Sequence, residues 1–181
     1  SIATMLAPGA AEVLAAVEHA HPSTTISFDP NCRPSIITDA DYARHQAEKF
    51  VTLADVVKAS DEDLEWLYPG VDPLDSARRW LSLGGSEGPA MVVVTRGAAG
   101  PWAVNAAGEA HVPAPAVKVA DTVGAGDSFM AALLSGIVDR GLNGAQNRKE
   151  LREFSAESLR ELLGHAAAAA AVTVSRAGAN P

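Results

Sequence analysis

Residues 121–134 read Asp-Thr-Val-Gly-Ala-Gly-Asp-Ser-Phe-Met-Ala-Ala-Leu-Leu, and this stretch decides how the chain is interpreted. Gly124 and Gly126 carry no Cβ, so the turn can bend tightly and a ligand can approach its backbone. Apolar residues then recur at i, i+4 and i+8, which predicts an amphipathic helix through Phe129, Leu133 and Ile137. The first amides of such a helix have no internal partner and lie at the positive end of its dipole. The stretch therefore predicts an anion site, with phosphate as the anion.

Asp127 lies in the first turn of this predicted helix. A carboxylate there would repel a phosphate, unless it removes a proton from the group that attacks the phosphate, which makes Asp127 a candidate general base. A second interpretation needs no chemistry, because an acidic residue in a first turn favours the helix dipole by about 0.3–1 kcal/mol. The residues alone leave both interpretations open.

The segment 121–134 resembles the C-terminal signature of the PfkB family of carbohydrate kinases, which have the ribokinase-like fold. The resemblance implies that the backbone of Gly124, Ala125 and Gly126 forms an anion hole for the transferred phosphoryl group. It also implies that Asp127 takes the proton from the sugar hydroxyl. Asp121 and the backbone near Val123 would hold a monovalent cation, potassium, as in some relatives.

Helical and strand patterns alternate along the whole chain. Besides the signature helix, helices are expected at about 8–20, 39–53, 60–67, 72–83 and 155–174, and strands at 24–28, 54–59, 91–95, 102–105 and 110–113. The alternation predicts an α/β fold with a mostly parallel sheet and helices on both faces. Ligands of such sheets bind outside the carboxyl ends of the strands. By resemblance the fold is ribokinase-like and incomplete at the N-terminus.

The first turn that follows a predicted strand is 29–34, Asp-Pro-Asn-Cys-Arg-Pro. It fixes the guanidinium of Arg33, whose five donors suit a phosphate or a polyol. It resembles the Asp-x-Asn-x-Arg of fructokinase-like and 2-keto-3-deoxygluconate-kinase-like family members. The resemblance implies a catalytic and substrate-binding role for Arg33 and places Asn31 beside the nucleotide phosphates. The alternative is a surface turn with a solvated arginine.

The second such turn is 58–63, Lys-Ala-Ser-Asp-Glu-Asp, where Ser60 with Asp63 at the third helical position is close to a capping box. It also resembles the family's Asn-x-x-Glu element, which orders magnesium and phosphate through water. The resemblance implies that Lys58 and Ser60 bind the nucleotide and that Asp63 meets Mg²⁺ through water. Serine and the shorter aspartate depart from the family pattern, so cap and function both remain open.

The third turn, 95–100, reads Thr-Arg-Gly-Ala-Ala-Gly and resembles the family's Thr-x-Gly-x-x-Gly nucleotide loop. The resemblance implies that Thr95, Gly97 and Gly100 bind the nucleotide. Alone the pattern is weak, because glycine-rich turns between strands are common. The alanine-rich end of the chain resembles the family's closing helix and turn beside the adenine, which implies nucleotide contacts for Asn180 and His165. An ordinary exposed helical histidine is an equal alternative for His165.

Composition excludes several other classes. The 181 residues carry a net charge of −8, which argues against nucleic-acid binding through a basic face. The single cysteine, Cys32, excludes an intramolecular disulfide and fits a reducing compartment. Neither a membrane span nor a signal peptide is visible, so a cytoplasmic location is expected, with sugar and ATP as small-molecule partners. Walker-type and dinucleotide-binding glycine patterns are both absent from the sequence.

The predicted function is ATP-dependent phosphorylation of a sugar hydroxyl, with fructose as the first candidate and Mg²⁺ as cofactor. Residues 1–181 would be the C-terminal nucleotide-binding and catalytic portion of such a kinase, since no Gly-Gly motif, sugar-binding acidic residue or β lid precedes Ser1. Within kinases, 2-keto-3-deoxygluconate, ribose and nucleosides are alternative substrates. A non-catalytic nucleotide-binding remnant or interaction module is the alternative outside them. An incomplete sheet would expose an edge and favour association, including a homodimer of the complete protein.

Overall fold

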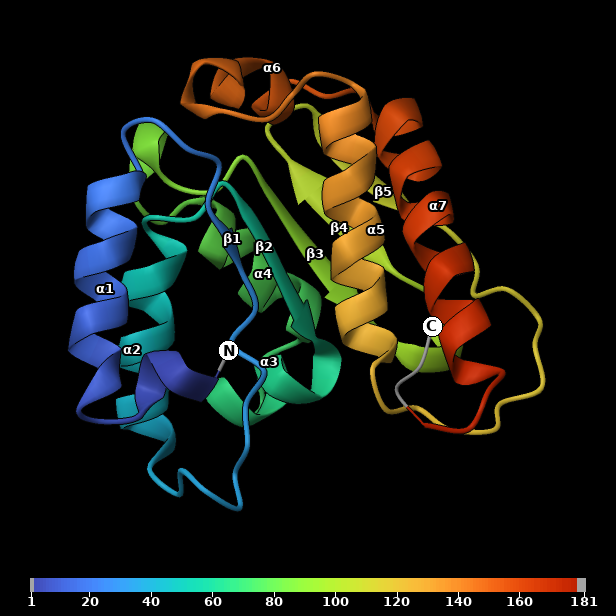
Figure 1. Ribbon diagram of the computed structural model, residues 1–181, viewed down its shortest axis with the longest axis horizontal. Coiled ribbons are helices and arrows are strands. Elements are labelled where there is room, and N and C mark those ends of the chain that lie inside the picture. Colours follow the sequence, from blue (N-terminus) through green and yellow to red (C-terminus); the bar gives the residue numbers. More distant parts are fainter. Residues whose placement is uncertain (1, 179–181) are drawn as a thin grey trace.

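The computed structural model describes residues 2–178, which form one five-stranded sheet between two layers of helices (Figure 1). The strands are β1 (Ser27–Phe28), β2 (Val56–Ser60), β3 (Met91–Thr95), β4 (Trp102–Asn105) and β5 (Gly108–His111), and they are arranged in that order. The pairs β1–β2 and β2–β3 are parallel, while β3–β4 and β4–β5 are antiparallel. The predicted α/β sheet is confirmed, and its antiparallel part includes the expected hairpin.

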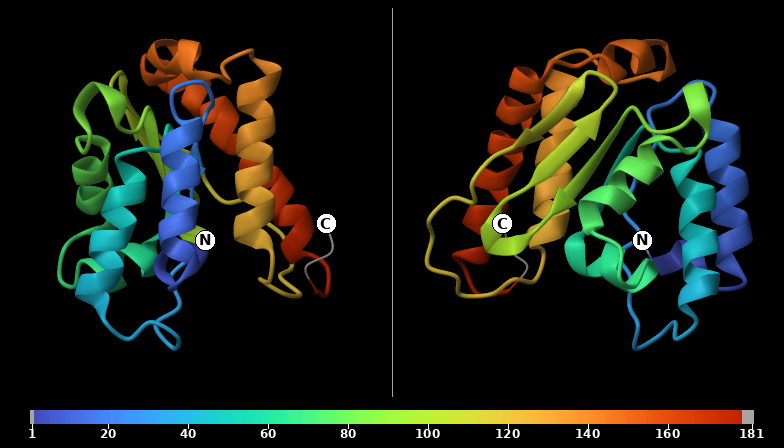
Figure 2. Two further views of the ribbon diagram at one scale, coloured as in Figure 1. Left: turned by 60° about the vertical axis from the view of Figure 1, so that its left-hand side comes forward. Right: turned by 180° about the vertical axis from the view of Figure 1, so that it is seen from behind.

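Helices cover both faces of the sheet, as the sequence pattern predicts (Figure 2). One face carries α1 (Gly9–Ala20), α2 (Ala40–Val51), α3 (Asp61–Leu67) and α4 (Pro73–Leu81). The other carries α5 (Ala125–Asp139), α6 (Arg148–Arg152) and α7 (Ala156–Val174). Short 3₁₀ turns lie at Ile2–Met5, Gly85–Glu87, Gly97–Ala99 and Ala145–Asn147.

Side chains of the central strands alternate between the two layers, because successive residues of a strand point to opposite faces. Val57 and Ala59 of β2 belong to the core beneath α1–α4, whereas Val56 belongs to the core beneath α5 and α7. Lys58 shares the parity of Val56 and therefore points toward α5. This alternation places the one charged residue of β2 on the side where α5 begins.

The structure differs from the sequence-based expectations at three places. The first strand is only two residues long, and β5 begins at Gly108 because the Asn105 side chain accepts hydrogen bonds from the Ala107 and Gly108 amides and tightens the hairpin. The short helix α6 was not expected. It is held mainly by tertiary contacts, with Leu151 fully buried in the second core.

Two strands of the described sheet, β1 and β5, lie at its edges. Within residues 2–178, no helix is both long and apolar enough to cross a membrane.

Candidate active site

The carboxyl ends of the parallel strands and the start of α5 lie at one end of the molecule (Figure 1). Asp29 follows β1, Ser60 closes β2 and Thr95 closes β3. Because these strands run in the same direction, the three residues lie along one edge. The sheet therefore gathers the three predicted turns at the N-terminus of α5.

The N-terminus of α5 has no side-chain cap, and of its first amides that of Ala125 donates to the Thr122 carbonyl at 3.2 Å. Gly124 precedes the helix in the left-handed region with φ of +80°, a conformation that favours glycine, and it offers no side chain to cap the first amides. The Asp127 side chain is exposed, and within residues 2–178 it forms no salt bridge. A carboxylate free of a cationic partner remains available to accept a proton.

A buried ion pair lies beneath this helix start. The Lys58 ammonium donates to Asp29 Oδ2 at 2.7 Å, and the two side chains are 6% and 16% exposed. A Cβ built on Gly126 would lie 2.9 Å from Lys58 Nζ. Since Gly126 is not in the left-handed region, its missing side chain is explained by the close approach of the ammonium rather than by backbone conformation.

The turn 29–34 is tightly built. The Asn31 amide donates to Asp29 Oδ1 at 2.9 Å, and Asn31 has a φ of +47°, which non-glycine residues rarely adopt. The Arg33 side chain is exposed, and its Nη1 donates to the Cys32 carbonyl at 2.7 Å. The turn is thus an Asx turn with an exposed guanidinium, as the surface-turn alternative expects, and the role of Arg33 in catalysis and substrate binding stays a prediction.

Asp63 forms the capping box that its spacing indicates. The Asp63 amide donates to Ser60 Oγ at 3.0 Å, while the Ser60 amide donates to Asp63 Oδ2 at 3.1 Å. Its other oxygen accepts from the Cys32 amide at 2.8 Å, so Asp63 also fastens the 29–34 turn to α3. Burial, followed by the charge of Asp63, raises the pKa of the Cys32 thiol well above its usual range, so this thiol is not a reactive thiolate.

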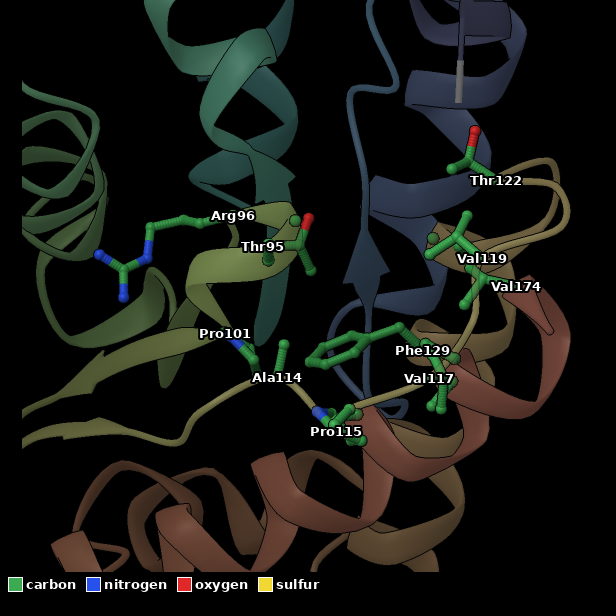
Figure 3. Close-up of a pocket in the computed structure, with 18 residues that line it drawn as sticks. Thr95, Arg96, Pro101, Ala114, Pro115, Val117, Val119, Thr122, Phe129 and Val174 are labelled. Atoms are coloured by element: carbon green, nitrogen blue, oxygen red, sulfur yellow. The ribbon is translucent and has the colours of Figure 1, made fainter.

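A cavity of about 600 Å³ opens beside the start of α5 (Figure 3). Its walls are mostly apolar and come from α5, α7 and the loop between β5 and α5. Phe129 forms one wall, and Ala167, Ala170 and Ala171 supply small side chains from α7. A mostly apolar cavity next to amides that can bind an anion suits a ligand with both a ring and phosphates.

The loop after β3 borders this cavity. Thr95 and Gly97 line it, whereas the Arg96 guanidinium points away and its Nε donates to the Gly100 carbonyl at 3.2 Å (Figure 3). Gly100 is buried, and a Cβ there would lie 2.2 Å from the Val112 carbonyl oxygen. Gly100 is therefore needed for packing against the residues that follow β5, while Thr95 and Gly97 face the cavity.

Three predicted site residues, His165, Asn180 and Asp121, lie away from the turns described above or outside the described residues. His165 is exposed on α7 and is not among the described residues that line the cavity, so the expected contact with a base has no geometric support. Asn180 lies outside the described residues. Asp121 accepts hydrogen bonds from the Val123 and Gly178 amides at 3.0 Å each, and these bonds, Val123 first, lower the pKa of its carboxyl group.

Sequence reasoning missed the loop 114–119, which supplies Ala114, Val117 and Val119 to the cavity. Its alternating Pro-Ala-Pro-Ala-Val sequence shows no helix or strand period, so it carried little signal. The partner of Lys58 was also missed, although a lysine inside an apolar strand indicates a buried pairing. Among residues 2–178, no group of three or more His, Cys, Asp and Glu side chains could hold a metal ion.

Residues 2–181 match the pfkB family carbohydrate kinase family along their whole length. The chain belongs to this family. Fructokinase of Rhizobium leguminosarum bv. trifolii is 38% identical over 115 residues, covering 64% of this chain and 34% of the relative. Fructokinase-2 of Solanum lycopersicum is 33% identical over 184 residues, covering 100% of this chain and 52% of the relative. The chain thus spans about a third to a half of the length of these relatives.

Solved structures of sugar kinases share the fold. Fructokinase with bound ATP from Xylella fastidiosa superposes with a TM-score of 0.83 at 26% identity, covering 98% of this chain and 54% of that one. Aminoimidazole riboside kinase from Salmonella enterica, complexed with its riboside and an ATP analogue, gives 0.77 at 26%, covering 99% and 56%. A fructokinase double mutant from Vibrio cholerae O395, with fructose, ADP and potassium ion bound, gives 0.73 at 25%, covering 99% and 54%. The ribokinase-like fold expected from the sequence is confirmed.

Proposed function

We propose that this protein takes part in ATP-dependent phosphorylation of a sugar hydroxyl, with fructose as the first candidate substrate. The uncapped N-terminus of α5 beside the cavity carries the proposal, because it joins an anion site to a space for a flat base. The fructokinase relatives and the ATP-bound fructokinase structure support it. Residues 1–181 would be the nucleotide-binding and catalytic portion.

In the proposed mechanism, Asp127 accepts the proton of the sugar hydroxyl as the oxygen attacks the γ-phosphorus in line. The backbone amides at 124–126 stabilise the charge that develops on the transferred phosphoryl group. Thr95 and Gly97 bind the nucleotide at the cavity rim, together with Asn31 and Ser60. The exposed Arg33 meets the phosphate or the sugar from the turn after β1.

Cations would accompany the nucleotide. Mg²⁺ is usually held by one or two carboxylates together with substrate phosphates, which fits a site where no three-residue cage is found among residues 2–178. When bound, it would neutralise part of the phosphate charge. Both oxygens of Asp63 accept backbone amides, so only a contact through water fits that residue. Potassium near Asp121 is proposed by analogy with the potassium-bound relative.

The test is turnover with ATP and fructose, measured on the protein as its gene encodes it, for wild type and Asp127→Asn. Loss of the base should lower kcat by about 10²–10⁴-fold. ADP affinity should stay within about twofold, because the amide removes a proton acceptor and keeps the shape of the side chain. Asp139→Asn is the matched control, since Asp139 is an exposed aspartate at the opposite end of the same helix.

Three outcomes separate the alternatives. Unchanged turnover in Asp127→Asn would refute the base assignment. ADP binding without turnover on any sugar would favour the non-catalytic remnant. Turnover on an aminoimidazole riboside or another nucleoside in preference to fructose, ribose or 2-keto-3-deoxygluconate would favour the second substrate class, which the riboside kinase neighbour suggests.

A further inference from the structure

Thr173 is a buried polar residue at the contact between two helices. It lies in the last turn of α7 and is 1% exposed. α7 packs beside α5 and runs in the opposite direction (Figure 1). Burying a hydroxyl costs free energy unless it forms a hydrogen bond. A valine would fill almost the same space without that cost, so the hydroxyl indicates a use for its hydrogen bond.

The Thr173 hydroxyl forms its short bond with the other helix. Thr173 Oγ1 donates to Ser128 Oγ at 2.7 Å, whereas the Ala169 carbonyl, the usual acceptor for a helical threonine, is 3.4 Å away. A hydroxyl has one proton, and the shorter contact has the better hydrogen-bond distance. The bond therefore joins the end of α7 to the first turn of α5.

Ser128 occupies a sensitive place in that turn. It follows Asp127 directly, and its amide donates to the Gly124 carbonyl at 2.9 Å, which closes the first turn of α5. A constraint on the Ser128 side chain thus acts on the backbone that carries Asp127 and the first amides of the helix. On the loop side of the same turn, the Val174 carbonyl accepts from the Ala120 amide at 2.7 Å. The end of α7 therefore holds this turn from both sides.

The rest of the interface between α5 and α7 is mainly apolar and belongs to the second core. Apolar contacts have no preferred direction, whereas a hydrogen bond requires a narrow range of distance and angle. Beyond the far end of α5, Arg140 donates to Glu161 at 3.3 Å, but this pair is exposed and contributes little. Among residues 2–178, the Thr173–Ser128 bond is the direct side-chain hydrogen bond between the two helices.

The cavity lies across this junction. α7 contributes Ala170 and Val174 to its wall, and α5 contributes Ala125 and Phe129. A nucleotide with its base in the cavity and its phosphates at the first amides of α5 would contact both helices. Its reacting phosphate meets the Asp127 carboxylate correctly only if the two helices keep their relative position. A misplacement of about 1 Å can lower a rate by about 10²-fold.

We propose that Thr173 is a positioning residue of the kinase site, whose hydroxyl holds Ser128 and thereby sets where the Asp127 carboxylate lies relative to a nucleotide in the cavity. This role rests on the proposed kinase function, in which Asp127 is the base. Thr173 itself is not among the residues that line the cavity, so it acts through Ser128.

The test compares Thr173→Val, which removes the hydroxyl and keeps the shape, with Thr173→Ser, which keeps the hydroxyl and removes a buried methyl group. In the encoded protein, kcat with ATP and fructose should fall at least about tenfold in Thr173→Val and stay within about twofold in Thr173→Ser. KM for ATP and the Kd of ADP should change by less than about threefold in both, because the cavity wall is unchanged. A role in packing alone predicts the opposite order of kcat.

Ser128→Ala removes the same bond from the other side. It should lower kcat as Thr173→Val does, and the double variant should lose no more than either single variant, since one interaction is lost in all three. After Ser128→Ala, the Thr173 hydroxyl still has the Ala169 carbonyl as an acceptor, and after Thr173→Val the half-buried Ser128 can reach water. Neither single change therefore leaves a fully buried polar group without a partner.

Glu161→Gln is the control, because it weakens the contact near the opposite end of the same two helices, and kcat should stay at the wild-type value. Wild-type kcat in Thr173→Val would overturn the positioning role, as would an equal loss in Thr173→Ser or multiplied losses in the double variant. Loss of turnover in Asp127→Asn alone would leave the proposed function standing without it. A wild-type protein with no turnover on any sugar would refute the proposed function, and the role of Thr173 with it.

Discussion

One buried ion pair, Arg148–Asp55, lies just before β2, and the other, Lys58–Asp29, includes a residue of β2. The two pairs differ in how fully their hydrogen-bonding groups are used. Arg148 donates to Asp55 and to the carbonyl oxygens of His21 and Thr24, while the second oxygen of Asp55 accepts the Ile26 amide at 2.7 Å. The Lys58 ammonium has three protons, and Asp29 is its one hydrogen-bond partner among residues 2–178. The first pair is a closed network, and the second remains open toward the start of α5. A closed network indicates a structural role, whereas an open one leaves capacity for a ligand.

The largest expected effect in this comparison comes from breaking the closed pair. Arg148→Met would leave the Asp55 carboxylate, 1% exposed, without its cation. Removing one partner of a buried pair destabilises by about 3–5 kcal/mol, so the free energy of unfolding should fall by that amount in urea titrations. Arg160→Met, on an exposed face of α7, is the control and should change it by less than about 0.5 kcal/mol. A near-neutral Arg148→Met would contradict the closed-network interpretation.

A smaller effect separates the two glycines of the 124–126 turn. Gly124→Ala forces an alanine into a φ of +80° and should lower the free energy of unfolding by about 1–2 kcal/mol. Gly126→Ala meets only the flexible end of Lys58, so stability should change by less than about 0.5 kcal/mol while kcat falls. Denaturant titrations and turnover assays on both variants check whether Gly124→Ala mainly lowers stability and Gly126→Ala mainly lowers kcat. Equal losses of stability would show that both glycines serve only the backbone.

The sequence could predict the features that depend on neighbouring residues, but it could not predict the ion pairs between distant residues. The α5 signature, the capping box at Ser60 and the alternation of strands and helices are local patterns, and the structure bears out the elements they indicate. The Arg148–Asp55 pair joins residues 93 positions apart, and the Lys58–Asp29 pair joins residues 29 apart. Neither spacing produces a periodic signal, so only the folded chain reveals them. Gly100 shows the same limit. In the sequence it matches a glycine of the nucleotide loop, and only the folded chain shows that it packs against the Val112 carbonyl.

The smallest expected effect concerns Asp121, a partly exposed carboxylate that contrasts with the buried Asp55. The Val123 and Gly178 amides lower the pKa of Asp121, so the folded state binds its proton less readily than the unfolded state does. Its stabilising contribution is therefore complete above the ordinary carboxyl pKa of about 4 and is lost as the pH falls through the lowered value. The difference in unfolding free energy between wild type and Asp121→Asn should be constant near neutral pH and shrink in that acid range.

Urea titrations of both proteins between about pH 2 and 7 would measure this difference. Asp139→Asn serves as the reference, because Asp139 is exposed on α5 and no hydrogen bond holds its side chain among the residues that the structure describes. A difference for Asp121 that stays constant through the acid range would mean that its hydrogen bonds act equally in the protonated state. The bond from the Gly178 amide joins the segment after α7 to the loop before α5, whereas the bond from the Val123 amide lies within that loop. Loss of both should therefore loosen the start of α5 and leave the region of the Arg148–Asp55 pair intact.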